Sequence, residues 1–338
     1  MKIKVLKICA FLLVAVMLCA SLASCSASRP IKSSKEDLTV VGTVGDFSVL
    51  YEEFRHVVMN YKLILENEHG KGIWDDPETA ELYRSELEER VYQNITVNYA
   101  VLSLCAEVGI SPENEIIQEA VQGYVDDTVS ECGGRKAYKT ALEEYYLTDS
   151  LFRFQIATDY CQNELYYVYT SDLGLIETDD NVIYDYIMAD NFVRTIHVYI
   201  QNDEGDDVAA NRSAAESVRE RILGGESINK IIGSSVNEDF SLTTTDGYYF
   251  THGEMIEEYE RAAFALEVGG ISEVVETYSG FYVIKRLPLE ADYVLKNLST
   301  LKYNYQYSEL NKFIDEKQGE LVFLPNDYCR GLDLVAMD

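Results

Sequence analysis

The stretch DGYYFTHGEMIEEYERAAFAL, Asp246–Leu266, decides the fold of this 338-residue chain. Its early part, Tyr248–Phe250, has the bulky residues typical of a short strand, and Ile256–Leu266 has the spacing of an amphipathic helix. A Gly-Gly turn follows. Two short runs of β-branched and aromatic residues, Val274–Glu276 and Phe281–Leu287, then predict a pair of strands. The stretch and its continuation therefore predict a strand, a helix and two strands in succession.

The residues before this stretch complete a compact α+β unit. β-Branched residues alternate over Val193–Ile200 and predict a strand. Ala209–Leu223 has one apolar face and predicts a helix that ends at two glycines, and Ile228–Ile232 predicts a short second helix. The full order is β-α-α-β-α-β-β over residues 193–288.

Residues 38–190 are predicted to be helical apart from their first strand. Val40–Val49 alternates around a Gly-Asp pair, as in a short β-element, and apolar residues then recur at three- and four-residue steps through Leu65. Glu78–Val108 predicts a long helix. The next helix is expected to begin at Ser111, because serine is a favourable N-cap and the proline after it suits a first turn.

The last part of the chain, residues 289–338, is also predicted to be mainly helical. Ala291–Lys317 has helical character, and Glu320–Phe323 reads as a short strand. A single helix gains little stability without packing partners. We therefore expect this segment to pack on residues 38–190, so that both ends of the chain form one helical body with the α+β unit inserted in it.

The α+β unit, residues 193–288, resembles the parvulin-type peptidyl-prolyl isomerases. The resemblance rests on an ordered series of short motifs: Asp246-Gly247, Gly253-Glu254-Met255, Tyr259 to Leu266, Gly269-Gly-Ile-Ser272, Val274-Val-Glu-Thr277 and Ser279-Gly-Phe-Tyr-Val-Ile-Lys285. It implies an α+β domain with a small antiparallel sheet. It also implies catalysis of rotation about X–Pro peptide bonds.

The resemblance assigns a polar catalytic centre to three residues. His197 matches the histidine of the opening strand, and Asp239 matches the acid after the short helix, with its neighbour Glu238 as the alternative. Tyr282 stands where the family has a second histidine. A tyrosine hydroxyl exchanges hydrogen bonds but does not take up a proton near neutral pH as histidine does. The resemblance therefore implies a reduced turnover. By residue type alone, His197 would be a hydrogen-bonded core histidine and Asp239 an ordinary loop acid.

Three further residues are implied to bind the proline ring. Met255 matches one position of the family's proline pocket, Tyr259 stands at a second that is usually phenylalanine, and Phe264 lies beside them. Residue type alone would make all three part of the core. Thr244-Thr245 replaces the two glycines usual in the preceding loop, which is a second departure from the family pattern.

Residues 1–24 are predicted to be a lipoprotein signal peptide. Three early lysines precede an apolar stretch, Ile8–Ala20, that is too short for a comfortable membrane span. Leu22-Ala-Ser-Cys25 resembles the bacterial lipobox, which implies a lipid on Cys25 and durable anchoring by several acyl chains. An ordinary signal peptide with an unmodified Cys25 is the alternative. The serine-rich residues 25–37 predict a polar tether.

Charge and cysteine content exclude several classes of function. The formal net charge is −30, which disfavours nucleic acid as a partner. A solvated acidic surface and an attraction for basic segments of unfolded clients both remain open. The cysteines after the tether match no zinc pattern and are expected to be unpaired, with one disulfide as the alternative: Cys105, Cys132, Cys161 and Cys329. No phosphate loop or metal cluster is evident, so no cofactor is expected. The remaining histidines, His56, His69 and His252, are expected at the surface.

The overall layout resembles the PrsA/SurA class of extracytoplasmic foldases. It implies a membrane-anchored isomerase and chaperone whose partners are unfolded or newly exported polypeptides with X–Pro bonds. One alternative is a non-catalytic, ATP-independent chaperone or peptide-binding lipoprotein with a degenerate parvulin domain. Another is a solute-binding lipoprotein that serves a transporter. Such proteins usually have two α/β lobes with parallel sheets, and the long helical half of this chain argues against them.

Overall fold

The computed structural model describes residues 30–337 except 71, 203–206, 235 and 240–245. The predicted signal peptide and Cys25 lie outside the described residues. Contacts divide the described residues into two compact units: those within 30–168 together with 313–337, and those within 169–312. Among the described residues, no helix combines the length and apolar character needed to cross a membrane.

The first unit contains a small sheet in the order β2-β1-β7. A short β-element was predicted around the Gly-Asp pair, and the structure has a hairpin there, formed by β1 (Val40–Val44) and β2 (Phe47–Leu50). β7 (Phe323–Pro325) pairs antiparallel with β1. The C-terminal strand thus joins the first strand of the chain. Gly42 allows this pairing, because a Cβ there would lie 2.5 Å from the carbonyl oxygen of Leu324.

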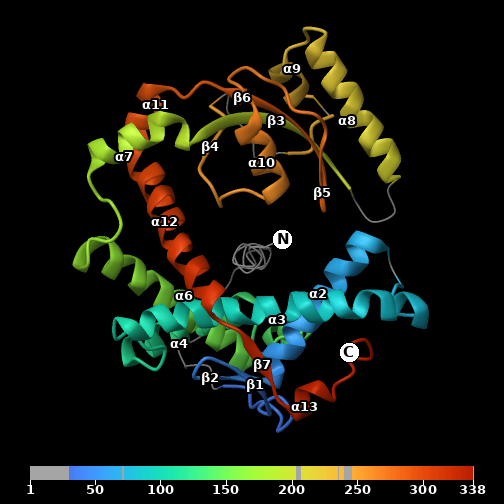
Figure 1. Cartoon of the computed structure of the whole chain (residues 1–338), viewed down its shortest axis with the longest axis vertical. Helices are drawn as coiled ribbons and strands as arrows, with labels where there is room; N and C mark the ends of the chain where they lie inside the picture. The colour runs from blue at the N-terminus through green and yellow to red at the C-terminus, as the bar shows by residue number, and fades with distance from the viewer. Residues whose placement is uncertain (1–29, 71, 203–206, 235, 240–245, 338) are drawn as a thin grey trace. The chain divides into compact units, whose positions relative to one another are not determined.

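Helices make up most of the first unit (Figure 1). They are α2 (Tyr51–His69), α3 (Pro77–Glu107), α4 (Glu115–Glu131), α5 (Arg135–Glu144), α6 (Asp149–Tyr167), the end of α12 (Leu298–Glu320) and α13 (Asp327–Arg330). The predicted start of α4 at Ser111 is wrong. Asn114 is its N-cap, and its Oδ1 accepts a hydrogen bond from the Ile116 amide at 2.9 Å. Ser111 instead caps a local turn, where its Oγ accepts a hydrogen bond from the Glu113 amide.

The second unit contains the predicted α+β arrangement, in the predicted order. Its elements are β3 (Val193–Gln201), α8 (Val208–Leu223), α9 (Ile228–Ile232), β4 (Tyr248–Phe250), α10 (Glu257–Ala265), β5 (Val275–Thr277) and β6 (Gly280–Leu287). The strands form an antiparallel sheet in the order β4-β3-β6-β5. The predicted fold class, α+β with a small antiparallel sheet, is confirmed.

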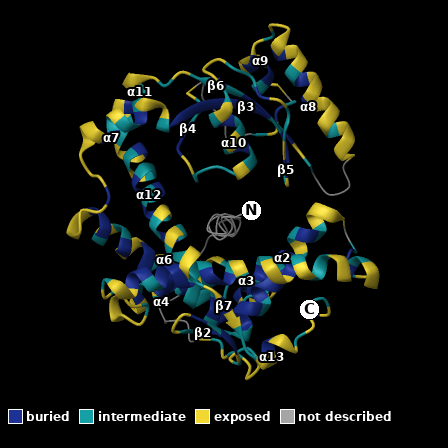
Figure 2. Ribbon diagram, in the orientation of Figure 1, coloured by how far each residue is buried: buried dark blue, intermediate teal, exposed yellow. Residues whose placement is uncertain are grey.

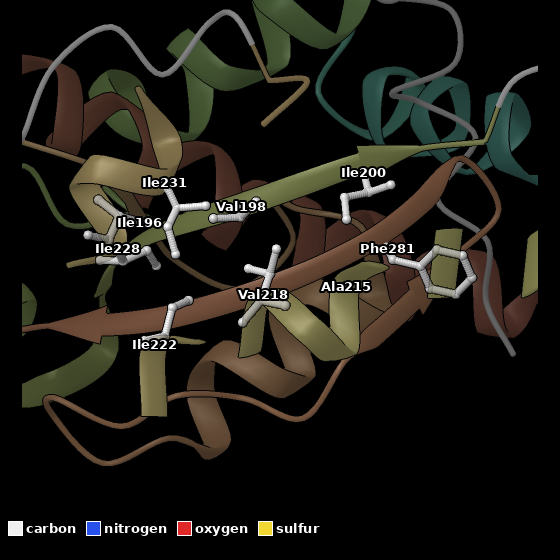
Figure 3. Close-up of a cluster of buried hydrophobic side chains, with 10 residues drawn as sticks. Ile196, Val198, Ile200, Ala215, Val218, Ile222, Ile228, Ile231 and Phe281 are labelled. Atoms are coloured by element: carbon white, nitrogen blue, oxygen red, sulfur yellow. The ribbon is translucent and has the colours of Figure 1, made fainter. Parts of the chain in front are cut away.

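Two helical layers cover the two faces of this sheet. Successive strand residues point to opposite faces, and alternate residues of β3, from Ile196 to Ile200, pack with α8 and α9 (Figure 3). The other face packs against α10 through a cluster that includes Val193, Phe250 and Ile284. β3 is buried along most of its length, whereas α8 is largely exposed on its outer side (Figure 2).

Further helices complete the second unit. They are the short π-helical turns η1 (Val168–Asp172) and η2 (Ile187–Asn191), α7 (Asp180–Tyr186), α11 (Ala291–Lys296) and the first part of α12. Apolar residues of η2, α7, α11 and α12, with Ile187 and Leu301 among them, form a separate cluster with Phe192 and with Tyr249 of β4. The compact unit, residues 169–312, thus contains helices on both sides of the predicted α+β segment 193–288, whose boundaries stay a prediction.

Candidate active site

The candidate site lies on the α10 face of the sheet and is built around His197. The side chain of His197 projects from β3 to the face opposite Ile196 and Val198, and its side chain is only 4% exposed. Both ring nitrogens have partners. Nε2 lies 2.9 Å from Asp239 Oδ2, and Nδ1 lies 2.9 Å from the hydroxyl of Tyr259. The structure therefore places the predicted histidine and the predicted acid in direct contact.

Two hydroxyl groups extend this contact into a longer network. The Tyr248 hydroxyl donates to Asp239 Oδ2 at 2.8 Å, and the Tyr259 hydroxyl lies 2.8 Å from Thr195 Oγ1. The residues come from four different segments: β3, the loop after α9, β4 and α10. We refer to this set, Thr195, His197, Asp239, Tyr248 and Tyr259, as the His197 network.

Aromatic rings enclose the imidazole of His197. Tyr248 stacks on it with ring centroids 5.4 Å apart, while Tyr259 and Tyr282 present their rings at nearly right angles, at 5.3 and 5.0 Å. Tyr282 in turn stacks on Tyr199 at 4.4 Å. The rings hold the histidine in place by packing, and they separate it from bulk water.

The loop after α9 is tied to β3, which fixes the position of Asp239. Asn237 Oδ1 accepts the amide proton of Tyr199, and the Glu238 amide donates to the Tyr199 carbonyl. The carboxylate of Glu238 accepts the Gln201 amide instead of approaching His197. Of the two acids left open by the sequence, Asp239 is thus the one whose carboxylate meets the histidine.

Gly247 brings β4 close enough for Tyr248 to reach Asp239. Its φ is +73°, in the region that favours glycine, and a Cβ at this position would collide with the carbonyl oxygen of Thr195. The carbonyl of the preceding residue, Asp246, accepts a hydrogen bond from the guanidinium of Arg194 at 2.6 Å. The Asp-Gly pair at 246–247 therefore has a local structural role at the edge of the site.

The residues expected to bind proline occupy different environments. Met255 and Phe264 remain partly exposed at the margin of the cluster around Phe250 and Ile284. Tyr259 is completely buried, and its hydroxyl points to His197. The structure thus brings Tyr259 into the His197 network, beneath the partly exposed apolar side chains.

Tyr282, the residue in place of a second histidine, contributes its ring to the site. Burial raises the pKa of its hydroxyl, and the neighbouring Ser279 side chain lowers it by a smaller amount. Burial likewise raises the pKa of Tyr259 well above the usual range for tyrosine. Both hydroxyls therefore keep their protons near neutral pH and remain hydrogen-bond donors.

Two members of the network, Thr195 and Tyr248, were not among the sequence-based candidates. Thr195 lies two residues before His197 on the same strand, so strand alternation alone places it on the same face. Tyr248 was assigned only to a strand. Its contact with Asp239 depends on the approach of β4 to the loop after α9, a tertiary feature that no local pattern reveals.

Other candidate chemical groups lie away from this site. In the first unit, Glu68, His69 and Glu86 lie close enough together to suggest a metal site, but Arg90 Nη2 donates to both acids, at 2.7 and 2.5 Å. His56 was expected at the surface, and this is wrong: it is buried, and its Nδ1 lies 3.0 Å from the Tyr145 carbonyl oxygen. The four cysteines among the described residues are all free thiols.

Comparison with known proteins finds a family match within the second unit. Residues 196–287 match the family model of the rotamase PPIC-type PPIase domain. This match confirms the resemblance to parvulin-type isomerases, and the chain carries a peptidyl-prolyl isomerase domain of that type.

Similar proteins extend the comparison along the chain. The chain is 22% identical over 311 residues to a foldase protein PrsA from Caldanaerobacter subterraneus subsp. tengcongensis, and the match covers 89% of each protein. It is 30% identical over 115 residues to a PrsA from Oceanobacillus iheyensis, covering 34% of this chain and 35% of that one. A solved PrsA from Streptococcus pneumoniae is 16% identical, with a TM-score of 0.37 over 87% of this chain and 92% of that chain.

Proposed function

We propose that this protein is a membrane-anchored foldase that catalyses cis–trans isomerisation of X–Pro bonds in newly exported polypeptides. The observation that carries the proposal is the His197–Asp239 contact inside a PPIC-type domain. The similarity to PrsA foldases along 89% of the chain supports the same assignment for the protein as a whole. Its substrates are unfolded chains, and no cofactor is needed.

The proposed mechanism is non-covalent. Rotation about an X–Pro bond is slow because amide resonance gives the C–N bond partial double-bond character, with a barrier of roughly 18–20 kcal/mol. In the twisted amide this resonance is lost. An enzyme that binds the twisted form more tightly than the planar form accelerates the reaction without any bond to the substrate.

The exposed end of the His197 network is the part that meets the substrate. The side chain of Asp239 is 15% exposed, against 4% for His197. The Tyr248 hydroxyl donates to Asp239 Oδ2, and His197 Nε2 lies 2.9 Å from the same oxygen, so the two contacts hold the carboxylate in one orientation. In this proposal the fixed carboxylate of Asp239 interacts with the substrate's X–Pro amide, whose charge distribution changes during rotation.

Apolar side chains beside the network provide the proposed surface for the proline ring. Met255, Phe264 and Tyr282 are partly buried and pack on the same cluster as Tyr259. An apolar surface for the ring leaves the neighbouring carbonyl poorly hydrated, and loss of hydration favours the less polar, twisted amide.

The proposed location is the outer side of a membrane, with a lipid on Cys25 as the anchor. The lipobox-like sequence Leu22-Ala-Ser-Cys25 and the polar residues that follow support this part of the proposal. A net charge of −30 suits a protein that stays soluble next to an anionic lipid surface and away from nucleic acid.

Refolding of a client tests this function. A protein whose slow refolding phase is X–Pro isomerisation should refold faster with the full chain present in catalytic amount. A His197→Gln variant should accelerate the phase much less. His69→Gln is the matched control, because His69 is exposed and lies in the first unit. Equal rates with and without wild-type protein would refute the isomerase function.

The second candidate is a chaperone that holds clients without catalysis. It is favoured by Tyr282, which stands where the family resemblance places a second histidine. Such a protein would suppress client aggregation when present in equal amount, and the His197→Gln variant would suppress it equally well. The isomerase proposal instead requires that the His197→Gln variant accelerate the slow refolding phase much less than the matched control variant does.

A further inference from the structure

Tyr259 combines complete burial with a hydroxyl placed between two polar side chains. Its exposed fraction is 0%, and its hydroxyl lies 2.8 Å from Thr195 Oγ1 and 2.9 Å from His197 Nδ1. α10 holds the ring by packing Tyr259 and Ala263 against Phe250 and Ile284. A buried hydroxyl needs partners, and here the partners fix the direction in which it points.

With a neutral imidazole, the donors and acceptors of the His197 network fit together in one consistent way. A carboxylate only accepts hydrogen bonds, so the contact between Asp239 and His197 requires a proton on Nε2. Nδ1 of the neutral ring then has a lone pair and accepts from the Tyr259 hydroxyl, whose own oxygen accepts from Thr195. Each hydroxyl in this series donates once.

The opposite tautomer of His197, with its proton on Nδ1, leaves one contact unsatisfied. If the proton of the neutral ring were on Nδ1, Nε2 would present a lone pair to the carboxylate of Asp239 at 2.9 Å. Two acceptors would then face each other in a partly buried site, which costs free energy. A phenylalanine at 259 would offer Nδ1 no donor.

We propose that Tyr259 is a positioning residue whose hydroxyl holds His197 in the tautomer that carries its proton on Nε2, towards Asp239. With both nitrogens engaged, the ring cannot turn over without breaking two hydrogen bonds. The orientation of Asp239, the exposed end of the network, therefore depends on a hydroxyl at its buried end. The consequence for catalysis rests on the proposed isomerase function, whereas the tautomer does not.

Nitrogen NMR of the full chain labelled with ¹⁵N-histidine tests the tautomer directly. The chain has four histidines, so the His197→Gln variant assigns the His197 signals by difference. At pH 8, above the usual range of histidine titration, we expect a protonated Nε2 and a bare, hydrogen-bonded Nδ1. In Tyr259→Phe the Nδ1 signal should move towards that of a nitrogen without a hydrogen bond. A proton on Nδ1 in the wild type would overturn the proposal.

Two further variants separate this role from simple loss of a buried hydroxyl. Thr195→Val removes the donor to Tyr259 but keeps the Tyr259–His197 contact, so the Nδ1 signal should stay close to that of the wild type. Tyr249→Phe is the matched control, because Tyr249 belongs to a different cluster with Phe192 and Val294. It should leave all His197 signals unchanged, and a shift as large as in Tyr259→Phe would contradict the proposal.

Kinetics then connect the tautomer to function. We expect Tyr259→Phe to lower kcat for an X–Pro peptide by roughly tenfold, the usual scale for one buried hydrogen bond to a catalytic network, with KM little changed. A loss confined to KM would show that Tyr259 serves binding alone and would overturn the proposal. If the wild type is inactive, the proposed function fails, and the nitrogen spectra still decide whether Tyr259 sets the tautomer.

Discussion

At the scale of single residues, the adjacent acids Glu238 and Asp239 have different partners. The carboxylate of Asp239 contacts His197 and Tyr248, whereas that of Glu238 accepts a backbone amide from β3. The Asp239 carboxylate thus belongs to the polar centre of the site, whereas the Glu238 carboxylate, on a side chain one methylene longer, makes a structural contact. Replacing either acid by its amide removes one negative charge at adjacent positions, so the two variants can be compared directly.

We predict that Asp239→Asn lowers kcat/KM for an X–Pro peptide by tenfold or more, because the asparagine side chain lacks the negative charge that His197 and Tyr248 orient. Glu238→Gln should change it by less than about twofold, since its contact with Gln201 lies outside the His197 network. Peptide isomerisation rates at equal protein concentration measure both. A larger loss of kcat/KM in Glu238→Gln than in Asp239→Asn would show that Glu238 is the catalytic acid.

A second residue-scale feature is a buried pair of titratable groups on α2. Burial raises the pKa of Glu53 from 4.5 to about 7, an effect reduced by hydrogen bonds from Tyr99 and Asn98. Burial also lowers the pKa of His56, from 6.5 to about 4. The two groups lie one helical turn apart, and they affect the pH dependence of stability in opposite directions.

The sign for Glu53 follows from proton binding. Between pH 4.5 and 7 the folded state keeps a proton that the unfolded chain loses, so the stabilising contribution is complete below pH 4.5 and is lost as pH rises through about 7. We predict that wild type loses about 3 kcal/mol relative to Glu53→Gln over this range. Urea unfolding followed by the fluorescence of Trp74, the one tryptophan, measures it. A pH-independent difference would contradict a raised pKa.

His56 has the opposite sign. Between pH 6.5 and 4 the unfolded chain takes up a proton that the buried ring does not, so its contribution is lost as pH falls. In Glu53→Gln, the pH dependence of stability caused by His56 is no longer offset by that of Glu53. The variant should therefore gain stability as pH rises from 4 to 6.5 more steeply than the wild type does.

At the scale of elements, local patterns predict the second unit well. Alternation and helical spacing give β3, α8, α9, β4, α10, β5 and β6 in the observed order, because each element has one face against the core. Boundaries depend on weaker local effects. α4 begins at Glu115 after an Asn114 cap, since asparagine competes well with serine as an N-cap.

The candidate site is less predictable than the elements that carry it. His197, Asp239 and Met255 are assigned by resemblance, and the structure brings the first two into contact. The roles of Thr195, Tyr248 and the Tyr259 hydroxyl depend on how β4 and α10 approach β3. These distances are set by packing between elements, so no sequence period encodes them.

Two glycines test packing in the first unit. Gly42 lies under β7, where a Cβ would meet Leu324 and the Phe323 ring, whereas a Cβ at Gly123 in α4 would have nothing within 4 Å. We predict that Gly42→Ala destabilises the unit by a few kcal/mol, on the order of other overpacked sites. Gly123→Ala should stabilise it by roughly 0.5–1 kcal/mol, the helix propensity difference.

The same urea unfolding followed by Trp74 fluorescence measures both glycine variants, because Trp74 lies in the first unit. The control makes the test specific, since the two substitutions add the same methyl group. Equal effects of the two would show that β7 does not pack closely over β1.

At the scale of the whole molecule, the chain combines two compact units with an N-terminal sequence that predicts a lipid anchor. α12 is the longest element near the C-terminus, and its residues are divided between the two units. The N- and C-terminal parts of the chain share the first unit through β1 and β7.

The proposed anchor leads to a prediction about location. In a bacterial host, Cys25→Ala should move the protein from the membrane fraction to the soluble fraction, because the acyl chains supply the membrane affinity. Metabolic labelling with radioactive palmitate should mark wild type and fail to mark the variant. Substitution of Cys105, a buried free thiol, is the control and should retain the label. Labelling of both proteins would place the lipid elsewhere.

The most direct test of the central claim is the exchange of a short X–Pro peptide between its cis and trans forms at equilibrium. NMR exchange spectroscopy follows it without a coupled protease, in the presence of a micromolar amount of the full chain. We predict accelerated exchange with wild type, exchange reduced by tenfold or more with Asp239→Asn, and unchanged acceleration with Tyr249→Phe. Exchange at the uncatalysed rate with the wild type would contradict the account.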